Sequence, residues 1–311
     1  MTGGRFAAGL VLIALAILVA PVPDTDFAAA VVHQRGGSPV VAVGNSIVDY
    51  VGRCDSDRRT IPQLLADRTG LKVADSSWGG QSVGTSVALA AIALKAKNVR
   101  VVVVPVAANA LSFGDSLPLQ TLSFARLTGG YLESADYAAR LRNGIGLSPS
   151  VAPYQQPFSY KGVHYPDYNG IKIKYLSSEV AHTVCPENLG VNRRFLAGYY
   201  WANYNAGTVQ AALLRDLARL QAKAKGEGKR VVVVLLPLDF EDAAALGPDV
   251  AAAMARRRRE VLAAAGIAGL DMLDLSGGEP VSSFAQRWCA CGHLSEQGRH
   301  HVVDRLAGTV R

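Results

Sequence analysis

The sequence is poor in several features that would point to particular classes of protein. It contains no internal repeat, no low-complexity tract and only 4 cysteines among 311 residues. The cysteines do not follow a zinc-finger spacing, and no stretch interleaves aromatic with basic residues, as nucleic-acid-binding domains often do. We therefore expect neither a repeat architecture nor a nucleic-acid partner.

Charged residues are also few: they make up 18% of the chain, against 50% hydrophobic residues. This composition suits one large domain with a substantial core, or one domain that carries an insertion. The net charge of +7 is spread along the chain except at Arg256–Arg259, inside a predicted helix. We expect this basic run to form a solvated helix face; a patch for an anionic partner is the alternative.

One long apolar run stands apart from the rest of the chain. Phe6–Ala20 contains no charged residue, follows Arg5 and is followed by two prolines. Such a run is typical of a signal-peptide core or a short membrane anchor. We expect an uncleaved anchor, with cleavage among the small residues near Phe27–Val32 as the alternative. Because either one exports the remainder, we predict a periplasmic or extracytoplasmic protein anchored to the inner (cytoplasmic) membrane.

The cysteines fit an exported protein, because an even number permits disulfides in an oxidising compartment, in any of three pairings. They are Cys54, Cys185, Cys289 and Cys291. The stretch Cys289–Cys291 followed by His293 resembles a metal-binding motif, but its spacing is tighter than that of a zinc knuckle and no second pair of ligands is evident. We expect disulfides rather than free thiols or a metal site, and no cofactor.

Apolar β-branched runs alternate with helical patterns along most of the chain. The predicted strands are Pro39–Val43, Leu71–Ala74, Arg100–Pro105, Arg230–Leu236 and Gly269–Leu273. The predicted helices are Thr60–Thr69, Thr85–Lys97, Thr208–Lys225, Asp249–Ala265 and Ser295–Ala307. Strands that alternate with helices form parallel sheets through right-handed crossovers. The sequence therefore predicts a flavodoxin-like α/β fold of about five parallel strands flanked by helices.

The alternation breaks between residues 110 and 205. This segment is rich in Tyr, Gly, Pro, Asn and Ser, and it shows no long periodic helix beyond Ser134–Arg142. We interpret it as a large insertion over the C-terminal edge of the sheet, where long loops are usually functional. The expected organisation is a signal anchor or signal peptide with a linker at residues 1–35, and one domain with this insertion at residues 36–311.

Four loops carry residues of the kind that acyl transfer needs. The first strand runs into Gly44–Ser46, where the serine is either a nucleophile or a cap of the next helix. The second strand is followed by Asp75–Gly84 and the third by Val106–Leu111, while Cys289–His301 places a histidine before the last helix. Parallel strands present such loops on one side of the sheet. A nucleophile, a base and oxyanion donors would thus meet there.

With these loops the sequence resembles the SGNH/GDSL hydrolase superfamily, from Pro39 to its C-terminus. The four blocks that carry the resemblance are Ser46 in VGNSIVDY, Gly80 in WGGQSVG, Asn109 in AANAL and His293 in GHLSEQGR. They stand in the family's order and at family-like separations. The resemblance implies an SGNH fold in which Ser46 forms an acyl-enzyme and His293 is the base. The glycine and the asparagine would donate to the oxyanion.

The sequence departs from the family's pattern in three places. Asn45 precedes the serine where the family usually has Asp, and the third block has alanines for a usual Gly and Asp. Ala290 stands three residues before His293, where the family has the Asp that orients the histidine. A backbone carbonyl could hold the ring in a serine–histidine dyad, or an acid from another loop could do so, or the protein could be inactive. Asp239, after the fourth strand, is the candidate acid.

The closest likeness within the superfamily is to membrane-anchored, exported members. These are the alginate O-acetyltransferases and the proteins that transfer D-alanine to lipoteichoic acid, which are similar in the apolar run, the insertion and the segment Phe195–Gln210. The likeness implies an O-acyltransferase for a cell-envelope glycan, with an acyl donor, a glycan or lipid acceptor and a membrane-bound acyltransferase partner. A carbohydrate or lipid esterase would present the same residues. A non-catalytic envelope assembly or glycan-binding protein is a further alternative.

The histidine loop also carries two of the cysteines. We predict at least one disulfide that involves Cys289 or Cys291. A bond between these two would close a very small strained ring, so the expected partner is Cys54 or Cys185. Such a bond would fix the histidine loop against another part of the site.

Overall fold

The computed structural model describes residues 37–52, 55–77, 81–112, 158–165, 193–205, 207–285 and 292–311. Its centre is a sheet of five parallel strands in the order β2-β1-β3-β6-β7. The strands are β1 (Val40–Gly44), β2 (Val73–Ser77), β3 (Val101–Val106), β6 (Arg230–Leu235) and β7 (Met272–Asp274). This is the strand order of doubly wound, flavodoxin-like proteins. The predicted fold class is confirmed.

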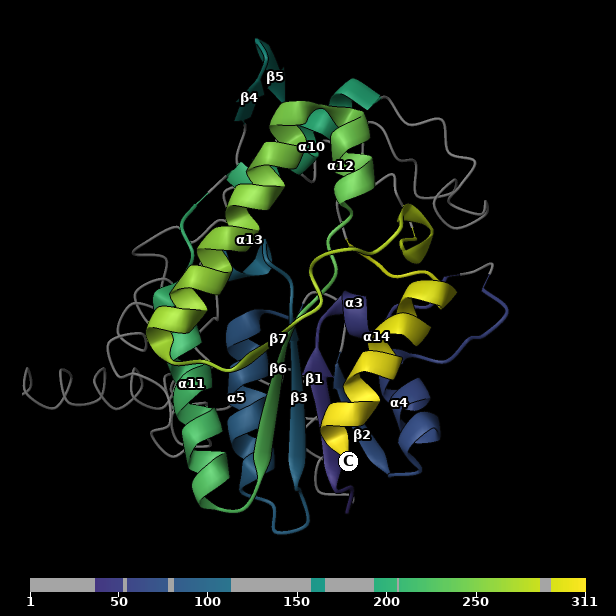
Figure 1. The fold of residues 1–311 in the computed structure, drawn as a ribbon, viewed down its shortest axis with the longest axis vertical. Helices are drawn as coiled ribbons and strands as arrows, with labels where there is room; N and C mark the ends of the chain where they lie inside the picture. Colours follow the sequence, from purple (N-terminus) through teal and green to yellow (C-terminus); the bar gives the residue numbers. More distant parts are fainter. Residues whose placement is uncertain are drawn as a thin grey trace, which may run out of the picture.

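Helices cover both faces of the sheet (Figure 1). One face is covered by α5 (Val83–Leu94), α11 (Ala211–Gly226) and α13 (Pro248–Ala268), and the other by α4 (Ile61–Thr69) and α14 (Glu296–Val310). Each of these helices and each strand of the sheet lies where the sequence predicts it, with ends that differ by no more than three residues.

Helix α4 illustrates why the sequence predicts these elements well. The Thr60 N–H donates to the side-chain oxygen of Gln63 at 2.9 Å, and Pro62 stands in the first turn, where its missing N–H is not needed. Gly70 then ends the helix in the left-handed conformation, with φ of 70°. These start and stop signals are local, so they can be read from the sequence.

Strand β3 shows how a continuous valine run forms a strand that is buried on both faces. Val102 and Val104 pack with α5 and α11, whereas Val101 and Val103 pack toward α4 and α14. Every residue of β3 is buried, so both faces of the strand need apolar side chains. The sheet therefore has a hydrophobic core on each side.

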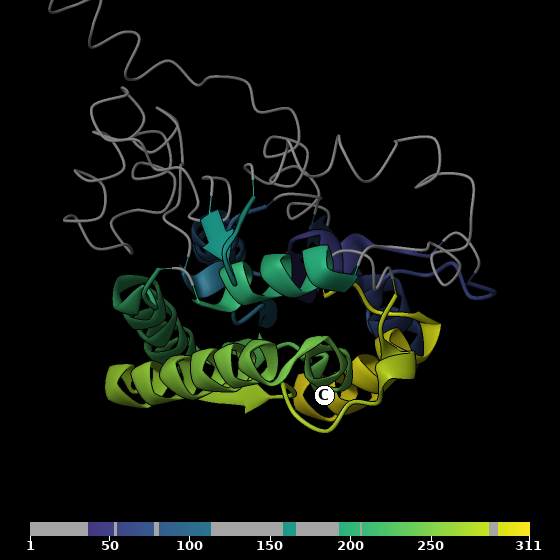
Figure 2. The same ribbon diagram turned by 90° about the horizontal axis from the view of Figure 1, so that it is seen from above.

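Shorter elements lie beyond the carboxyl ends of the strands (Figure 1). They are α3 (Ser46–Asp49), η1 (Ala110–Ser112), α12 (Phe240–Leu246) and η4 (Val281–Ser283). The insertion adds the hairpin of β4 (Phe158–Tyr160) and β5 (Val163–Tyr165), and helix α10 (Arg193–Asn205). Seen from above, α10 lies alongside α13 (Figure 2). Ligand sites of open parallel sheets are found at this edge.

Helix α10 contradicts the expectation that the insertion has no long helix beyond Ser134–Arg142. Its sequence, RRFLAGYYWANYN, contains glycine, asparagine and several aromatic residues, which are weak helix formers. The helix is stabilised by packing instead, because Tyr199, Tyr200 and Tyr204 are buried in the core. Tertiary contacts override a local pattern that does not predict a helix.

Several predictions fall on residues that the structure does not describe. These include the apolar run Phe6–Ala20 and the predicted helix Ser134–Arg142. The division of the chain at residues 35 and 36 stays a prediction. Within the described ranges, no helix has both the length and the hydropathy needed to cross a membrane.

The basic run Arg256–Arg259 is only in part the solvated helix face that we expected, because Arg256 and Arg259 are exposed but Arg257 and Arg258 are not. Arg257 is 2% exposed, and its guanidinium donates to the carbonyl of Tyr204 at 3.3 Å. Arg258 pairs with Asp274 at the end of β7, at 2.5 Å. The reason is that α13 packs against α10 and α11, so this part of the helix faces protein as well as water.

Candidate active site

Ser46 and His293 meet at the carboxyl edge of the sheet. Nε2 of His293 lies 3.0 Å from Oγ of Ser46. The serine is the first residue of α3, directly after the turn that follows β1, and the histidine lies just before α14. The two residues that the sequence predicts as nucleophile and base are therefore within hydrogen-bond reach of each other.

A tight turn between β1 and α3 places the serine. Gly44 has no room for a side chain, because a Cβ there would lie 2.4 Å from Cγ2 of Val48. The side chain of Asn45 caps α3 by accepting from the N–H of Ile47 at 3.1 Å. Because Asn45 supplies the cap, the alternative reading of Ser46 as the capping residue is wrong.

The buried side chain of Gln81 braces this turn. In the orientation that satisfies both ends of its amide, the nitrogen donates to the carbonyls of Gly44, at 2.7 Å, and Ser76, at 3.1 Å. The amide oxygen accepts from the Ser86 hydroxyl at 2.8 Å. One side chain thus ties the ends of β1 and β2 to α5. A buried amide with its partners satisfied is rigid, so Gln81 helps to fix the backbone from which Ser46 projects.

Backbone pairing places His293. Its carbonyl accepts from the N–H of Ala285 at 2.8 Å, and Leu294 forms an antiparallel bridge with the segment before the loop. Helix α14 begins at once, capped by the Ser295 hydroxyl, which accepts from the N–H of Gly298 at 3.2 Å. The imidazole is therefore held close to the start of a well-packed helix.

Burial sets the protonation state of the histidine. His293 is 9% exposed, and the loss of water around the ring lowers its pKa to about 4. The imidazole is therefore neutral at neutral pH. This is the form whose Nε2 can accept a proton from Ser46.

An aromatic ring lies on the imidazole. The Tyr50 ring stacks on His293, with ring centroids 4.3 Å apart and planes 10° from parallel. Tyr50 follows α3, and its N–H donates to the carbonyl of Ser46 at 2.8 Å. Burial raises the pKa of Tyr50, Asp55 raises it further, and Arg299 opposes this. The serine and the stacking ring thus come from one helical turn.

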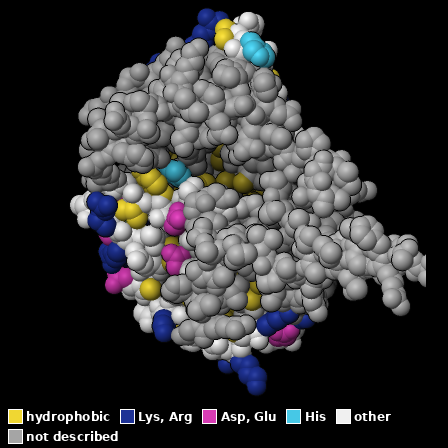
Figure 3. Space-filling model, turned by 180° about the vertical axis from the view of Figure 1, so that it is seen from behind, with side chains coloured by type: hydrophobic (Ala, Val, Ile, Leu, Met, Phe, Trp, Pro, Cys, Tyr) yellow, Lys and Arg dark blue, Asp and Glu magenta, His cyan; other side chains and the backbone are white. Residues whose placement is uncertain are grey.

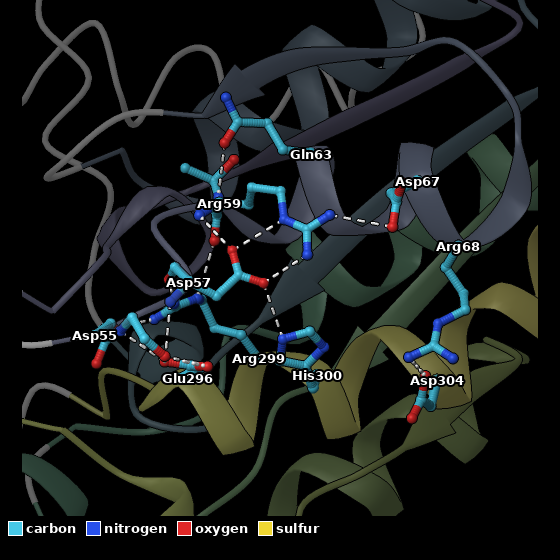
Figure 4. Close-up of polar contacts among 12 residues, drawn as sticks. Asp55, Asp57, Arg59, Gln63, Asp67, Arg68, Glu296, Arg299, His300 and Asp304 are labelled. Carbon is cyan, nitrogen blue, oxygen red and sulfur yellow. Dashed lines mark hydrogen bonds and ion pairs between the residues drawn. The ribbon is translucent and has the colours of Figure 1, made fainter.

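The loop after α3 is held by the Arg299 side chain of α14 (Figure 4). Arg299 is fully buried and donates to the Asp55 carboxylate at 2.6 Å. It also donates to the carbonyls of Asp57, at 2.6 Å, and Arg59, at 3.1 Å. Asp55 in turn accepts from the N–H of Gly52 at 2.7 Å. A buried cation needs partners of this kind, and here they join the helix to the loop.

Glu296, in the first turn of α14, makes a second connection to the same loop. Its carboxylate accepts from the N–H groups of Ser56, at 2.8 Å, and Asp57, at 3.0 Å. These hydrogen bonds lower the pKa of Glu296, and the bond from Asp57 contributes most. His300 lies 3.1 Å from the Asp57 carboxylate (Figure 4). The serine loop and the helix beside the histidine are therefore joined at several points.

Of the two predicted oxyanion donors, the structure describes Asn109. Asn109 lies in the turn after β3, the strand next to β1, and is partly buried. Its Oδ1 accepts from the N–H of Ala110 at 3.0 Å, so Nδ2 is the end of the amide that can donate to an oxyanion. Outside the described residues lie Gly80, Cys54, Cys185, Cys289 and Cys291. The predicted disulfide stays a prediction.

The candidate acid Asp239 caps a helix. It is buried, and its Oδ1 accepts from the N–H of Asp242 as the N-cap of α12, at 2.9 Å. Burial raises the pKa of Tyr204 in α10, and Asp239 raises it further. The cap accounts for an acid at this position, and a role in orienting His293 stays a prediction.

Figure 3 shows hydrophobic side chains and a histidine side chain close to one another on one face of the molecule, with acidic side chains nearby. Among the residues that the structure describes, no group of three or more His, Cys, Asp or Glu could hold a metal ion. The described site contains a hydroxyl, an imidazole and an amide.

Sequence reasoning missed Tyr50, Gln81 and Arg299. Each stands in one of the blocks that carry the resemblance: VGNSIVDY, WGGQSVG and GHLSEQGR. Arg299 also shares a face of its helix with buried apolar residues such as Val302 and Leu306. A charge on the apolar face of a predicted helix was the one signal that could have marked it as buried and paired.

The fold and the site together define an α/β protein with a serine–histidine pair at the carboxyl edge of a parallel sheet. No protein-family model matches the chain, and no curated protein matches it. Among solved structures, a candidate SGNH hydrolase from Slackia heliotrinireducens aligns with a TM-score of 0.39 and 14% identity, over 89% of this chain and 100% of its own. A likeness of this size does not establish a family, so the function has to be argued from the site.

Proposed function

We propose that this chain catalyses serine-dependent acyl-ester chemistry of the SGNH type, through an acyl-enzyme on Ser46. The observation that carries the proposal is the 3.0 Å contact between Oγ of Ser46 and Nε2 of His293. A serine hydroxyl is a weak nucleophile until a base within reach takes its proton. The buried imidazole supplies that base in its neutral form, because its pKa is about 4.

In the proposed reaction, Nε2 of His293 takes the hydroxyl proton as Oγ of Ser46 bonds to the acyl carbon. The tetrahedral intermediate then breaks the bond to the leaving alcohol, which receives the proton back from His293. The Nδ2 of Asn109 and the N–H of Gly80 would donate to the oxyanion. An acceptor hydroxyl next attacks the serine ester while Nε2 of His293 takes its proton. The bond between the acyl carbon and Oγ then breaks, and the proton passes from His293 to Oγ, which regenerates Ser46.

We further propose that the acceptor is a hydroxyl of a cell-envelope glycan, which makes the chain an O-acyltransferase. The support is in the sequence: the apolar run Phe6–Ala20 would keep the site near the outer face of the cytoplasmic membrane. The resemblance to exported acyltransferases points the same way, and a membrane-bound partner would supply the acyl donor. An esterase would use the same serine and histidine, and differs in whether water reaches the acyl-enzyme.

Labelling with a fluorophosphonate probe, read by peptide mass spectrometry, tests the ester chemistry. We expect label on Ser46 of the wild type, and none in Ser46→Ala or His293→Ala. Ser159→Ala is a matched control, because the Ser159 hydroxyl lies 3.4 Å from Nδ1 of His164 in an exposed hairpin. A folded wild type that does not label would support the non-catalytic alternative.

Transfer and hydrolysis are separated by a second measurement. The protein is acylated with p-nitrophenyl acetate, and the product is followed with and without an envelope oligosaccharide as acceptor. An O-acyltransferase should place acetate on the sugar and release it slowly to water. Acetate release that is fast and unaffected by the sugar would make the protein an esterase.

A further inference from the structure

We propose that Tyr50 is a positioning residue, whose ring holds the His293 imidazole in the plane from which Nε2 reaches Ser46. This inference rests on the proposed function, because it assigns a role in proton transfer to a contact beside the site. The residue three positions before the histidine is Ala290, whose side chain cannot hold the ring. The stacked tyrosine offers a different restraint.

The contacts of the imidazole with Tyr50 and Ser46 restrict different motions. With ring centroids 4.3 Å apart and planes 10° from parallel, rotation of the imidazole about its Cβ–Cγ bond would drive its edge into the tyrosine. The stack therefore fixes the plane of the imidazole. Within that plane, the 3.0 Å contact with Ser46 fixes the direction of Nε2. Together the two contacts define the orientation of the imidazole.

The segments that bring the two rings together are joined by an ion pair and hydrogen bonds. Tyr50 and Asp55 lie on the loop after α3, while His293 precedes α14, which carries Arg299. The Asp55–Arg299 pair at 2.6 Å joins these segments, and so do the bonds from Ser56 to Glu296. These contacts hold the loop that carries the tyrosine, and a residue that positions a reacting group needs such support.

The stack also favours the state that forms during the reaction. When His293 accepts the proton from Ser46 it becomes a cation, and the face of a tyrosine ring attracts cations. The effect should be larger for this buried ring than for an exposed one, because less water screens the charge. We expect orientation and charge together to contribute about ten-fold in acylation rate, which corresponds to about 1.4 kcal/mol.

The experiment compares four full-length variants by the single-turnover rate of acylation with p-nitrophenyl acetate. Tyr50→Phe keeps the flat ring and should stay within about three-fold of the wild type. Tyr50→Leu and Tyr50→Met remove the flat face, and should lower the maximal acylation rate about ten-fold with little change in the substrate concentration that gives half of this rate. Tyr160→Leu is the control, because Tyr160 in the hairpin also contacts an aromatic ring, that of Trp201, with centroids 5.4 Å apart and planes tilted by 38°. It should change stability but not the rate per folded molecule.

The outcomes separate this inference from the proposed function. If the wild type does not acylate at Ser46, the proposed function fails. If it does, and both Tyr50→Leu and Tyr50→Met acylate as fast as the wild type, only the role of Tyr50 is refuted. Circular dichroism gives the folded fraction for each variant, so that Tyr50→Met carries the test should Tyr50→Leu fold poorly. An equal loss in Tyr160→Leu would also overturn the inference, since it would reflect general destabilisation.

Discussion

The hydroxyl of Ser46 and Nε2 of His293 lie 3.0 Å apart, although 247 positions separate the two residues in the sequence. The fold explains this meeting. Strand β1 ends at the carboxyl edge just before the serine, and α14 packs on α4 beside the same face, so the loop before α14 returns to that edge. The topology of the parallel sheet therefore brings the serine and the histidine together.

The pH dependence of acylation should reflect the burial of the histidine. His293 acts as a base only when it is neutral, and burial lowers its pKa from 6.5 to about 4. Activity should therefore stay level from neutral pH down to about pH 5, and fall by half near pH 4. An exposed imidazole would lose half its activity near pH 6.5.

The rate constant for fluorophosphonate labelling, measured across this range, checks the expectation. Circular dichroism at each pH shows whether the protein is still folded, so that loss of structure is not mistaken for titration of the base. A midpoint near pH 6.5 in a folded protein would show that the imidazole is hydrated in solution.

The sequence predicted the parts of this protein that depend on local signals. Strand β3 is recognisable because a strand buried on both faces is a continuous run of apolar residues, here mostly valines. Helix α4 is recognisable because its capping residues lie directly before and after it in the sequence. The serine and histidine blocks were found because each stands at a fixed place after a strand or before a helix. These features require no knowledge of distant contacts.

The remaining features depend on what lies across the fold. Helix α10 forms because its aromatic residues are buried, and its own sequence favours a helix only weakly. The stack of Tyr50 on His293 and the pairing of Arg299 with Asp55 join residues far apart in the chain. A basic residue in a helix is usually solvated, and even where its place on an apolar face marks it as buried, the sequence does not show which residue pairs with it.

The Asn109 amide should contribute to turnover. Since its Oδ1 accepts from Ala110, the Nδ2 is the group that can donate to an oxyanion. Loss of one oxyanion donor typically lowers turnover about 10²–10³-fold. Asn109→Ala should show this loss in kcat. Asn205→Ala, at the end of α10, is the matched control, and an Asn109→Ala variant with the control's turnover would exclude the assignment.

Substitution of Asp239 tests which group orients the His293 imidazole, since Ala290 stands where an aspartate would do so. As the N-cap of α12, Asp239 can be replaced by asparagine, which caps about as well. If a backbone carbonyl of the Cys289–Cys291 stretch orients His293, Asp239→Asn should remain within a few-fold of the wild type. This is the outcome we expect. A loss of about 10⁴ in kcat, with unchanged stability, would instead identify Asp239 as the orienting acid.

The cysteines can be counted chemically. We expect fewer than four thiols to react in denaturant without reductant, because Cys289 or Cys291 should be bonded to Cys54 or Cys185. Cys54 is next to Asp55 in the sequence. A bond from Cys54 would therefore join the same two segments that Arg299 joins. Four reactive thiols in carefully unreduced protein would rule the disulfide out.

Arg299 should be far more important for stability than a surface arginine on a neighbouring element. The Arg299 side chain is 0% exposed and that of its partner Asp55 is 14% exposed. Removing one member of a buried pair leaves the other charge uncompensated and typically costs about 3–5 kcal/mol. Arg299→Met, which keeps much of the volume, should lower the free energy of unfolding by about this amount.

A second arginine, which joins α4 to α14, provides the control. Arg68 in α4 pairs with Asp304 in α14 at 2.7 Å, but these side chains are 49% and 50% exposed. Water screens such a pair, so Arg68→Met should change the free energy of unfolding by at most about 1 kcal/mol. Urea unfolding of both variants measures the difference. Equal losses would mean that the Arg299–Asp55 pair is not buried in solution, and the loop of Tyr50 would then have to be held by Glu296 and His300.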